Sequence, residues 1–340
     1  MRRRTYRILI IVVFCAAAFY VALFFVRPAD APQTYGVTFT KSYAEYLGVD
    51  WRAAYLALLD DLDVRRVRLG AYWPEIEPTA GQYTFDDLDW MMDEAAKHDA
   101  EVVLAIGVRL PRWPECHIPD WVNTGQEPKE LAIRGSQGYP YAEVVEQYRH
   151  HPALAMWQVE NEPFLRIFGA CPRMDGAYID ERIALVRGID TEHPILITDS
   201  GELSTWQRTA RRGDRFGTTM YRIVWNPIIK YWRYDHILPP ALYRVKAYLA
   251  GQRARDVVIA ELQAEPWVPA GNIRDIAYDE LQPLFTTDDF EKNIAFAKAT
   301  GFGDVYLWGA EYWYWLREVH GDPSLWDAAR ELLRPEQTST

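Results

Sequence analysis

Two glutamates that lie far apart in the chain each stand where an apolar, β-rich run ends. Glu162 comes just after the run 153–161, and Glu261 ends the run 256–261. Two carboxyl groups held about 5 to 5.5 Å apart can hydrolyse a glycoside with retention, because one attacks the anomeric carbon while the other protonates the leaving oxygen and later activates water. Glu265 is an alternative to Glu261, but Glu261 directly ends the apolar run and is preferred.

Such a pair can act only if the fold brings it together. From residue 35 onward, short apolar runs alternate with amphipathic stretches of helical period, which is the pattern of repeated βα units. The expected strands are 35–39, 64–70, 101–107, 153–161, 194–198, 215–220, 256–261 and 304–308. The expected helices are 50–62, 86–98, 141–150, 180–189, 239–249, 287–300 and 323–333, with a weaker one near Ser204.

This count of elements favours an α/β fold of one particular kind. Eight strands that are each followed by a helix close a (β/α)₈ TIM barrel, whereas a doubly wound sheet usually has fewer strands. We see no internal linker or low-complexity run and therefore expect a single domain over residues 35–335. Residues 35–40 lack the glycine spacing of a dinucleotide-binding turn, so a nucleotide cofactor is not expected.

In a TIM barrel the catalytic groups lie at the C-terminal ends of the strands and on the loops that follow. The polar or aromatic residues at the ends of the expected strands are therefore the candidates for catalysis and substrate binding. Those that stand there are Arg68, Asn161, Glu162, Tyr221, Glu261 and Trp308.

Three segments carry a resemblance to a known group of enzymes. They are WQVENEPF at 157–164, VVIAEL at 257–262 and RLGAYWPEIEPTAGQYTFDDLD at 68–89. The set resembles the clan A glycoside hydrolases, barrel families that include cellulases, mannanases and β-galactosidases. The resemblance implies that Glu162, after the fourth strand, is the acid/base and that Glu261, after the seventh, is the nucleophile.

The same resemblance implies roles for the neighbours of the two glutamates. Asn161 would bind the 2-hydroxyl of the sugar, Tyr221 and Arg68 would bond to the nucleophile, and Trp308 would be the ring on which the sugar stacks. Further candidate contacts are Trp73, Trp267, Trp113, Trp225 and Arg109. Several related families have one histidine near the end of the third strand and another two residues before the tyrosine of the sixth. This chain has Gly107-Val108-Arg109 and Thr219 there, which leaves the subfamily and the sugar open.

Composition supports a carbohydrate partner and argues against others. The chain has 14 Trp and 21 Tyr, and such rings stack on the apolar faces of sugars, although they can equally fill the layer between barrel and helices. A formal net charge of −11 makes nucleic acid an unexpected partner. The seven His are scattered and form no His-x-His pattern at a strand end, so we expect no metal.

Two other functions use the same residues or some of them. A transglycosylase would keep every residue named above and would differ only in passing the sugar to another sugar instead of water. A non-catalytic, membrane-anchored carbohydrate-binding barrel would keep the aromatic rings but would not need two facing carboxylates. Oligomeric state is left open.

The N-terminus predicts a membrane segment. Arg2, Arg3, Arg4 and Arg7 precede an uncharged run from Ile8 to Val26. About 19 residues at 1.5 Å each span a bilayer as a helix. We expect residues 1–7 in the cytoplasm, a signal anchor over 8–26, a linker over 27–34 and an extracytoplasmic domain. The alternative is a signal peptide cleaved near residues 29–31, which would leave a secreted protein.

Two cysteines fall in neighbouring loops of the expected barrel. Cys116 and Cys171 follow the third and fourth strands, and in an oxidising compartment they could form a disulfide. The alternative is two unpaired thiols.

Overall fold

The protein is described by a computed structural model that covers residues 2–29, 31–122, 138–169, 171–268 and 273–334, with no side-chain description for residues 2–4. Eight parallel strands form a closed barrel in the order β1-β10-β9-β6-β5-β4-β3-β2. Their bounds are β1 Thr34–Thr38, β2 Arg66–Gly70, β3 Glu101–Ile106, β4 Leu154–Val159, β5 Ile195–Asp199, β6 Arg215–Met220, β9 Val257–Gln263 and β10 Asp304–Trp308. All eight expected strands are therefore confirmed.

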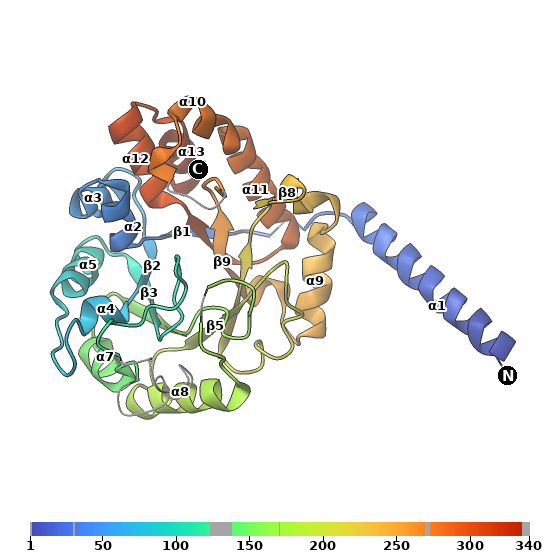
Figure 1. Cartoon of the computed structure of the whole chain (residues 1–340), viewed down its shortest axis with the longest axis horizontal. Helices are drawn as coiled ribbons and strands as arrows, with labels where there is room; N and C mark the ends of the chain where they lie inside the picture. Colours follow the sequence, from blue (N-terminus) through green and yellow to red (C-terminus); the bar gives the residue numbers. More distant parts are fainter. Residues whose placement is uncertain (1, 30, 123–137, 170, 269–272, 335–340) are drawn as a thin grey trace, which may run out of the picture.

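Helices surround the barrel (Figure 1). Seven of them match expected helices: α3 Trp51–Asp60, α5 Asp86–Lys97, α7 Tyr141–Tyr148, α8 Gly176–Ile189, α9 Pro240–Leu249, α11 Thr287–Thr300 and α13 Ser324–Leu333. The structure adds α2 Lys41–Leu47, α4 Trp73–Ile76, α10 Tyr278–Leu281 and α12 Ala310–His320, and an antiparallel hairpin of β7 Ile223–Asn226 and β8 Lys230–Arg233.

The weak helix expected near Ser204 is wrong. The described residues there form turns. The Ser204 hydroxyl donates to Asp199 at 2.6 Å, and the backbone N–H of Trp206 donates to the same hydroxyl at 3.3 Å. Because side-chain oxygens satisfy this backbone locally, the chain gains its hydrogen bonds without a helix.

The barrel interior is arranged in layers, because side chains along a strand alternate between inside and outside. One layer is apolar and contains Val103, Leu196, Val258 and Tyr306. The interior also contains polar side chains: Arg68 on β2 and Gln158 on β4 are fully buried and hydrogen-bonded to each other, although their register partners, Val103 and Leu196, belong to the apolar layer.

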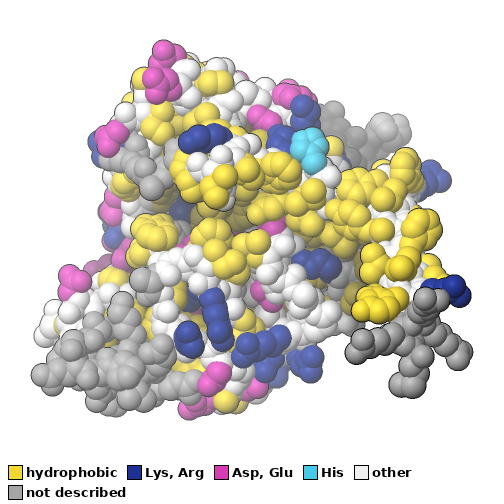
Figure 2. Space-filling model, turned by 45° about the vertical axis from the view of Figure 1, so that its right-hand side comes forward, with side chains coloured by type: hydrophobic (Ala, Val, Ile, Leu, Met, Phe, Trp, Pro, Cys, Tyr) yellow, Lys and Arg dark blue, Asp and Glu magenta, His cyan; other side chains and the backbone are white. Residues whose placement is uncertain are grey.

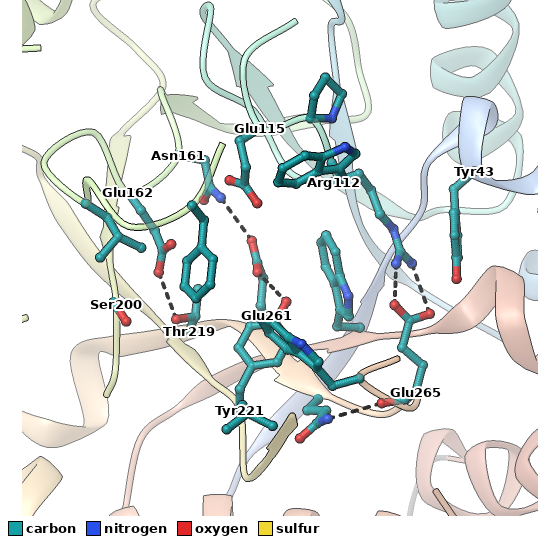
Figure 3. Close-up of a pocket in the computed structure, with 18 of the residues that line it drawn as sticks. Tyr43, Arg112, Glu115, Asn161, Glu162, Ser200, Thr219, Tyr221, Glu261 and Glu265 are labelled. Carbon is teal, nitrogen blue, oxygen red and sulfur yellow. Dashed lines mark hydrogen bonds and ion pairs between the residues drawn. The ribbon is translucent and has the colours of Figure 1, made fainter. Parts of the chain in front are cut away.

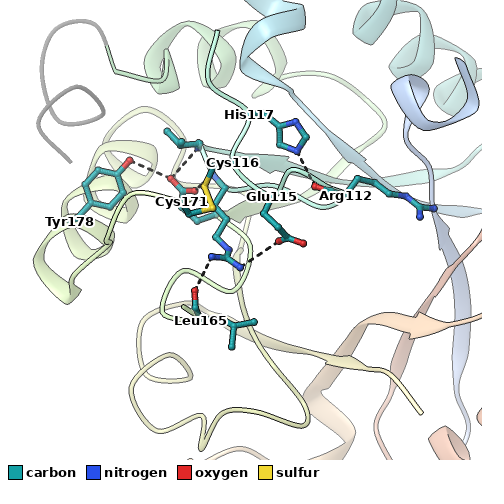
Figure 4. Close-up of a disulfide and its surroundings, with 10 residues drawn as sticks. Arg112, Glu115, Cys116, His117, Leu165, Cys171 and Tyr178 are labelled. Carbon is teal, nitrogen blue, oxygen red and sulfur yellow. Dashed lines mark hydrogen bonds and ion pairs between the residues drawn. A yellow bond between two sulfur atoms is a disulfide. The ribbon is translucent and has the colours of Figure 1, made fainter. Parts of the chain in front are cut away.

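A disulfide joins Cys116, in the loop after β3, to Cys171, in the loop after β4 (Figure 4). Their Cα atoms are 5.4 Å apart. Of the two alternatives left by the sequence, the bridged one is confirmed. It ties two loops at the mouth of the barrel to each other.

The N-terminal segment forms α1 Arg2–Ala22 and a short 3₁₀ turn, η1 Leu23–Phe25. Helix α1 projects away from the barrel (Figure 1). The stretch Thr5–Phe25 is long and apolar enough to cross a membrane and is almost entirely unburied. A signal sequence has the same length and composition.

Candidate active site

A cleft of about 1030 Å³ opens at the C-terminal ends of the strands (Figure 3). Both predicted catalytic glutamates, Glu162 and Glu261, line it. Four of the six predicted substrate contacts line it too: Asn161, Tyr221, Trp267 and Trp308. The closing of the barrel thus brings together residues from β4, β6, β9 and β10 that are widely separated in sequence.

Glu261 is surrounded by hydrogen-bond donors. Its Oε1 accepts from Arg68 at 3.0 Å and from Asn161 Nδ2 at 3.2 Å, and its Oε2 accepts from the Tyr221 hydroxyl at 2.9 Å. Hydrogen bonds to a charged partner such as arginine are short and directional. Together the three donors hold the Glu261 carboxyl in one orientation in the cleft.

Arg68 does more than pair with one acid. Its guanidinium is fully buried on β2, and besides Glu261 it donates to Gln158 at 2.8 Å and to Asn161 Oδ1 at 2.9 Å. A buried charge is tolerated only when it is paired and hydrogen-bonded. Arg68 thereby fixes the relative positions of Glu261 and Asn161.

The hydroxyl of Tyr221 stays protonated and can therefore donate to Glu261. Burial, together with the adjacent charge of Glu261, raises the pKa of the Tyr221 hydroxyl well above its usual value. The phenol therefore keeps its proton over the working pH range and remains a donor to the carboxylate.

Glu162 is as buried as Glu261 but has different hydrogen-bond partners and no arginine donor among those described. Its carboxyl is buried, and the Thr219 hydroxyl donates to it at 2.9 Å. Burial, the charge of Glu261 and the carboxyl of Glu115 raise the pKa of Glu162 well above its usual value. A carboxylic acid that keeps its proton near neutral pH can act as a general acid.

Replacing Thr219 by Val should change the pH dependence of activity by changing the pKa of Glu162. The Thr219 hydrogen bond favours the ionised form of Glu162, so its loss raises the pKa of Glu162 further. We expect the basic limb of the kcat/KM profile to move to higher pH by roughly 0.5 to 1 pH unit. A pH–rate series on an aryl glycoside measures this, with Thr219→Ser as the control that keeps the hydroxyl. A limb that moves to lower pH would contradict the assignment.

The backbone around Glu162 is strained. Glu160 and Glu162 have positive φ values of 58° and 44°, and each non-glycine residue in this region costs about 1–3 kcal/mol. The Glu160 carboxylate accepts hydrogen bonds from Arg109 N at 2.6 Å and from the Tyr141 hydroxyl at 2.5 Å. These contacts give Glu160 a structural role, since they hold the turn that bears Glu162.

Gly107 is needed beside this turn. Its φ is 136°, and a Cβ atom added there would lie 2.5 Å from the carboxyl carbon of Glu160. The glycine thus allows the loop after β3 to approach the turn after β4 closely.

An arginine that the sequence did not single out supports Trp308. The guanidinium of Arg112 lies between two rings, 3.7 Å from the centroid of Tyr43 and 4.0 Å from that of Trp308. It also donates to Glu265 and to Glu311, the latter at 2.9 Å. Glu265, the alternative nucleophile, lines the cleft but is engaged in this ion pair (Figure 3).

A third carboxyl enters the cleft from the loop after β3. Glu115 precedes the bridged Cys116 and faces the site (Figures 3 and 4). Burial raises its pKa to about 7, although the positive charge of Arg109 opposes this. Nothing in the sequence pattern distinguished Glu115, because its position depends on the disulfide and on the loop.

The other tryptophans and Arg109 occupy different surroundings. Trp113 lines the cleft from its rim, and Trp267 packs edge-on against Tyr221 with 5.4 Å between centroids. Trp225 lies on the hairpin and is not among the lining residues. Arg109 is buried behind the cleft, where it donates to the carbonyl of Leu165 at 2.8 Å.

The prediction that Trp73 contacts the sugar is wrong. Its ring is fully buried, is absent from the cleft lining, and donates to Glu77 at 2.7 Å. It packs edge-on against Trp121 and Tyr139. The cause is the first turn of α4, which begins at Trp73 and directs the ring into the core.

Within the ranges that the structure describes, no three His, Cys, Asp or Glu side chains are grouped so that they could hold a metal ion.

Comparison with known proteins agrees with this geometry. A sequence model of glycoside hydrolase family 42, described as β-galactosidase, matches residues 50–243, more than half of the chain. The match includes Arg68, Asn161, Glu162 and Tyr221, and it ends before Glu261.

Curated relatives are similar over shorter stretches. The β-galactosidase BgaA of Clostridium cellulovorans is 26% identical over 168 residues, which cover 44% of this chain and 25% of that protein. A β-galactosidase of an Arthrobacter species is 29% identical over 143 residues, covering 37% and 21% respectively. These matches thus span a quarter or less of the relatives' length.

Solved structures share the fold. A GH5_18 protein from Streptomyces cattleya in complex with GlcNAc superposes with a TM-score of 0.56 at 16% identity, covering 82% of this chain and 71% of that one. A β-galactosidase from Halorubrum lacusprofundi gives 0.55 at 15% identity, covering 88% and 58%. With the barrel and the family match taken together, the chain belongs to glycoside hydrolase family 42, the β-galactosidase family, within clan A.

Proposed function

We propose that this glycoside hydrolase cleaves β-glycosidic bonds with retention of configuration, with Glu261 as nucleophile and Glu162 as acid/base. The observation that carries the proposal is the contrast between their surroundings. Glu261 receives three hydrogen bonds, including one from a buried arginine, whereas Glu162 is buried with a raised pKa. Two carboxyls in one cleft with different environments are suited to different roles.

The proposed reaction has two steps. In the first, Glu261 attacks the anomeric carbon while Glu162 gives its proton to the leaving oxygen, and a glycosyl ester forms on Glu261. In the second, ionised Glu162 takes a proton from water, which attacks the same carbon and frees Glu261. Once Glu261 is esterified its charge is gone, so the pKa of Glu162 falls, which suits the change from acid to base.

Asn161 is suited to binding the sugar at the point of cleavage. Its Oδ1 accepts from Arg68 and from the Thr198 hydroxyl at 2.9 Å, which fixes the amide with its nitrogen toward Glu261. The nitrogen has two hydrogens, and we assign the second to the 2-hydroxyl. A donor there stabilises the oxocarbenium-like transition state more than the ground state.

The sugar is proposed from the relatives. The names of the curated relatives describe β-galactosidases, so β-galactosides are the first substrates to test. Transglycosylation would use the same residues and differ only in the acceptor. A purely carbohydrate-binding role is less well supported, because binding alone does not require the donors that converge on Glu261.

Proton NMR of the first product tests the stereochemistry. A panel of aryl β-glycosides identifies a cleaved substrate, and spectra taken in the first minutes show which anomer of the sugar forms. We expect the β-anomer first and the α-anomer only through slow mutarotation. If the α-anomer forms first, the enzyme inverts and Glu261 is not a nucleophile.

We further propose that α1 is an uncleaved signal anchor that holds the enzyme outside the cytoplasm. The length and exposure of Thr5–Phe25 support a membrane span, and the basic N-terminus supports its orientation. The Cys116–Cys171 disulfide agrees with an oxidising compartment.

A further inference from the structure

The hairpin β7–β8 and the turn after it expose apolar side chains. Ile228 is 86% exposed, Ile229 53% and Ile237 41%, and Tyr231 is exposed as well. Single exposed apolar residues are common, but a cluster this close in the chain marks a surface that meets another apolar phase. We refer to these four residues as the hairpin face.

One residue of the hairpin face, Ile237, contacts the proposed anchor. The Tyr20 hydroxyl of α1 donates to the backbone carbonyl of Ile237. The 3₁₀ turn η1 contacts α9, and Arg244 of α9 donates to the carbonyl of Arg27 at 2.9 Å. Figure 1 shows β8 and α9 on the side from which α1 leaves, and Figure 2 shows hydrophobic side chains continuing from α1 over the adjoining body.

The contact between Tyr20 and Ile237 indicates the depth of Ile237 along α1, and hence its depth in a bilayer that α1 crosses. The apolar stretch runs to Phe25, so Tyr20 lies roughly 7.5 Å, or about one and a half helical turns, inside its outer end. The carbonyl of Ile237 accepts a hydrogen bond from Tyr20, so Ile237 lies beside the outer end of the apolar stretch Thr5–Phe25 and not beyond it. In a bilayer crossed by α1, the hairpin face would reach the headgroup region.

We infer that the hairpin face is a second membrane-contact site, which inserts into the outer interface of the bilayer beside the anchor. The composition fits a lipid interface: two isoleucines at the turn are followed by Lys230 and Tyr231, and the Lys230 ammonium lies 5.7 Å from the ring centroid of Trp225. Aromatic rings and a lysine around apolar tips are typical of interfacial segments. Four exposed residues are too few for a stable dimer interface.

This inference rests on the proposed anchoring by α1 but not on the proposed hydrolysis. It has a consequence for the site, because the hairpin follows Tyr221 directly and Val224 of β7 lines the cleft, as does Tyr234. Docking of the hairpin face therefore fixes one rim of the cleft close to the lipid headgroups.

The test uses the full chain in phosphatidylcholine vesicles. In a Cys15→Ser background, Ile229→Cys is labelled with a small environment-sensitive fluorophore, and vesicles with brominated acyl chains serve as quenchers. The matched control is Val319→Cys, which is 55% exposed near the end of α12, a helix that Figure 1 shows on the side of the barrel away from α1. We expect at least a twofold stronger quenching at 229 than at 319.

Three other results would overturn the inference. Equal, weak quenching at both positions in chains that float with the vesicles means that the hairpin face stays in water. A label at 229 that is shielded from aqueous iodide but not quenched by brominated lipid means that a second copy covers the face. If the unlabelled chain does not float with the vesicles, α1 does not anchor the protein, and the inference is wrong as well. None of these results depends on enzymatic activity.

Discussion

Replacement of Glu261 by Gly is expected to lower kcat by at least about 10⁴-fold on an aryl glycoside, because the glycosyl ester can no longer form. Azide, which fits the space left by the side chain, should restore part of the rate and give an α-glycosyl azide from a β-glycoside. Product NMR identifies the anomer. In Glu261→Gln the side chain has nearly the same shape as glutamate and can still accept a hydrogen bond from Arg68. This variant should be inactive, and azide should not restore its activity.

The matched control is Glu265→Gly. Glu265 is four residues further along, lines the same cleft and pairs with Arg112. Its loss should weaken the support of Trp308 and reduce activity, but azide should give no α-glycosyl azide. If the glycosyl azide appears with Glu265→Gly and not with Glu261→Gly, the two glutamates have been assigned in the wrong order.

The stability of these variants needs a separate measurement. Removing one partner of a buried ion pair leaves an unpaired charge and costs about 3–5 kcal/mol. Arg68 would be left in that state by Glu261→Gly, although Gln158 and Asn161 Oδ1 still accept from it. Both variants remove the negative charge, but the amide oxygen of Gln can still accept a hydrogen bond from Arg68 and glycine cannot. Thermal unfolding should therefore show a lower Tm for the Gly variant than for the Gln variant, while both lose activity.

The sequence predicted the barrel well because its signal is local. Each strand is a short apolar run followed by a polar residue, and the alternation with amphipathic helices is visible without any knowledge of contacts. The residues at strand ends, such as Arg68, Asn161 and Tyr221, could be located for the same reason. A residue at the C-terminal end of a strand lies at the mouth of the barrel once the eight strands close, so its position follows from the position of its strand.

Residues on the loops could not be predicted in this way. Arg112 has a defined place only because Glu265, Glu311 and two rings from other parts of the chain surround it. Glu115 depends likewise on a disulfide to another loop. Trp73 shows the opposite error, since it stands directly after a strand in a recognisable motif, but the first turn of α4 directs its ring into the core.

Thr219 is an intermediate case. The sequence showed only that it stands where related families have a histidine. The structure shows that it donates to Glu162, so its hydroxyl takes part in setting the protonation of that acid. A residue at a strand end could thus be located, whereas its partner could not.

Replacement of Glu162 by Ala is expected to separate the two steps of the reaction. Loss of a general acid/base costs about 10²–10⁴-fold. With a poor leaving group the first step needs the acid, so kcat/KM should fall by that factor. With a dinitrophenyl leaving group the first step proceeds without an acid, and the second step, which lacks its base, becomes limiting. We expect a burst of dinitrophenol followed by slow turnover, with a lowered KM.

Azide distinguishes this variant from the nucleophile variant. It should accelerate turnover of Glu162→Ala on the dinitrophenyl substrate and give a β-glycosyl azide, because the ester on Glu261 is still formed and is attacked from the vacated side. Glu115→Ala is the matched control: Glu115 is a second buried carboxyl of the cleft with a raised pKa, yet we assign it no proton transfer to substrate. That variant should show neither the burst nor the β-azide. If Glu115→Ala gives both and Glu162→Ala gives neither, the acid/base enters from the loop after β3, and the strained turn after β4 has another purpose.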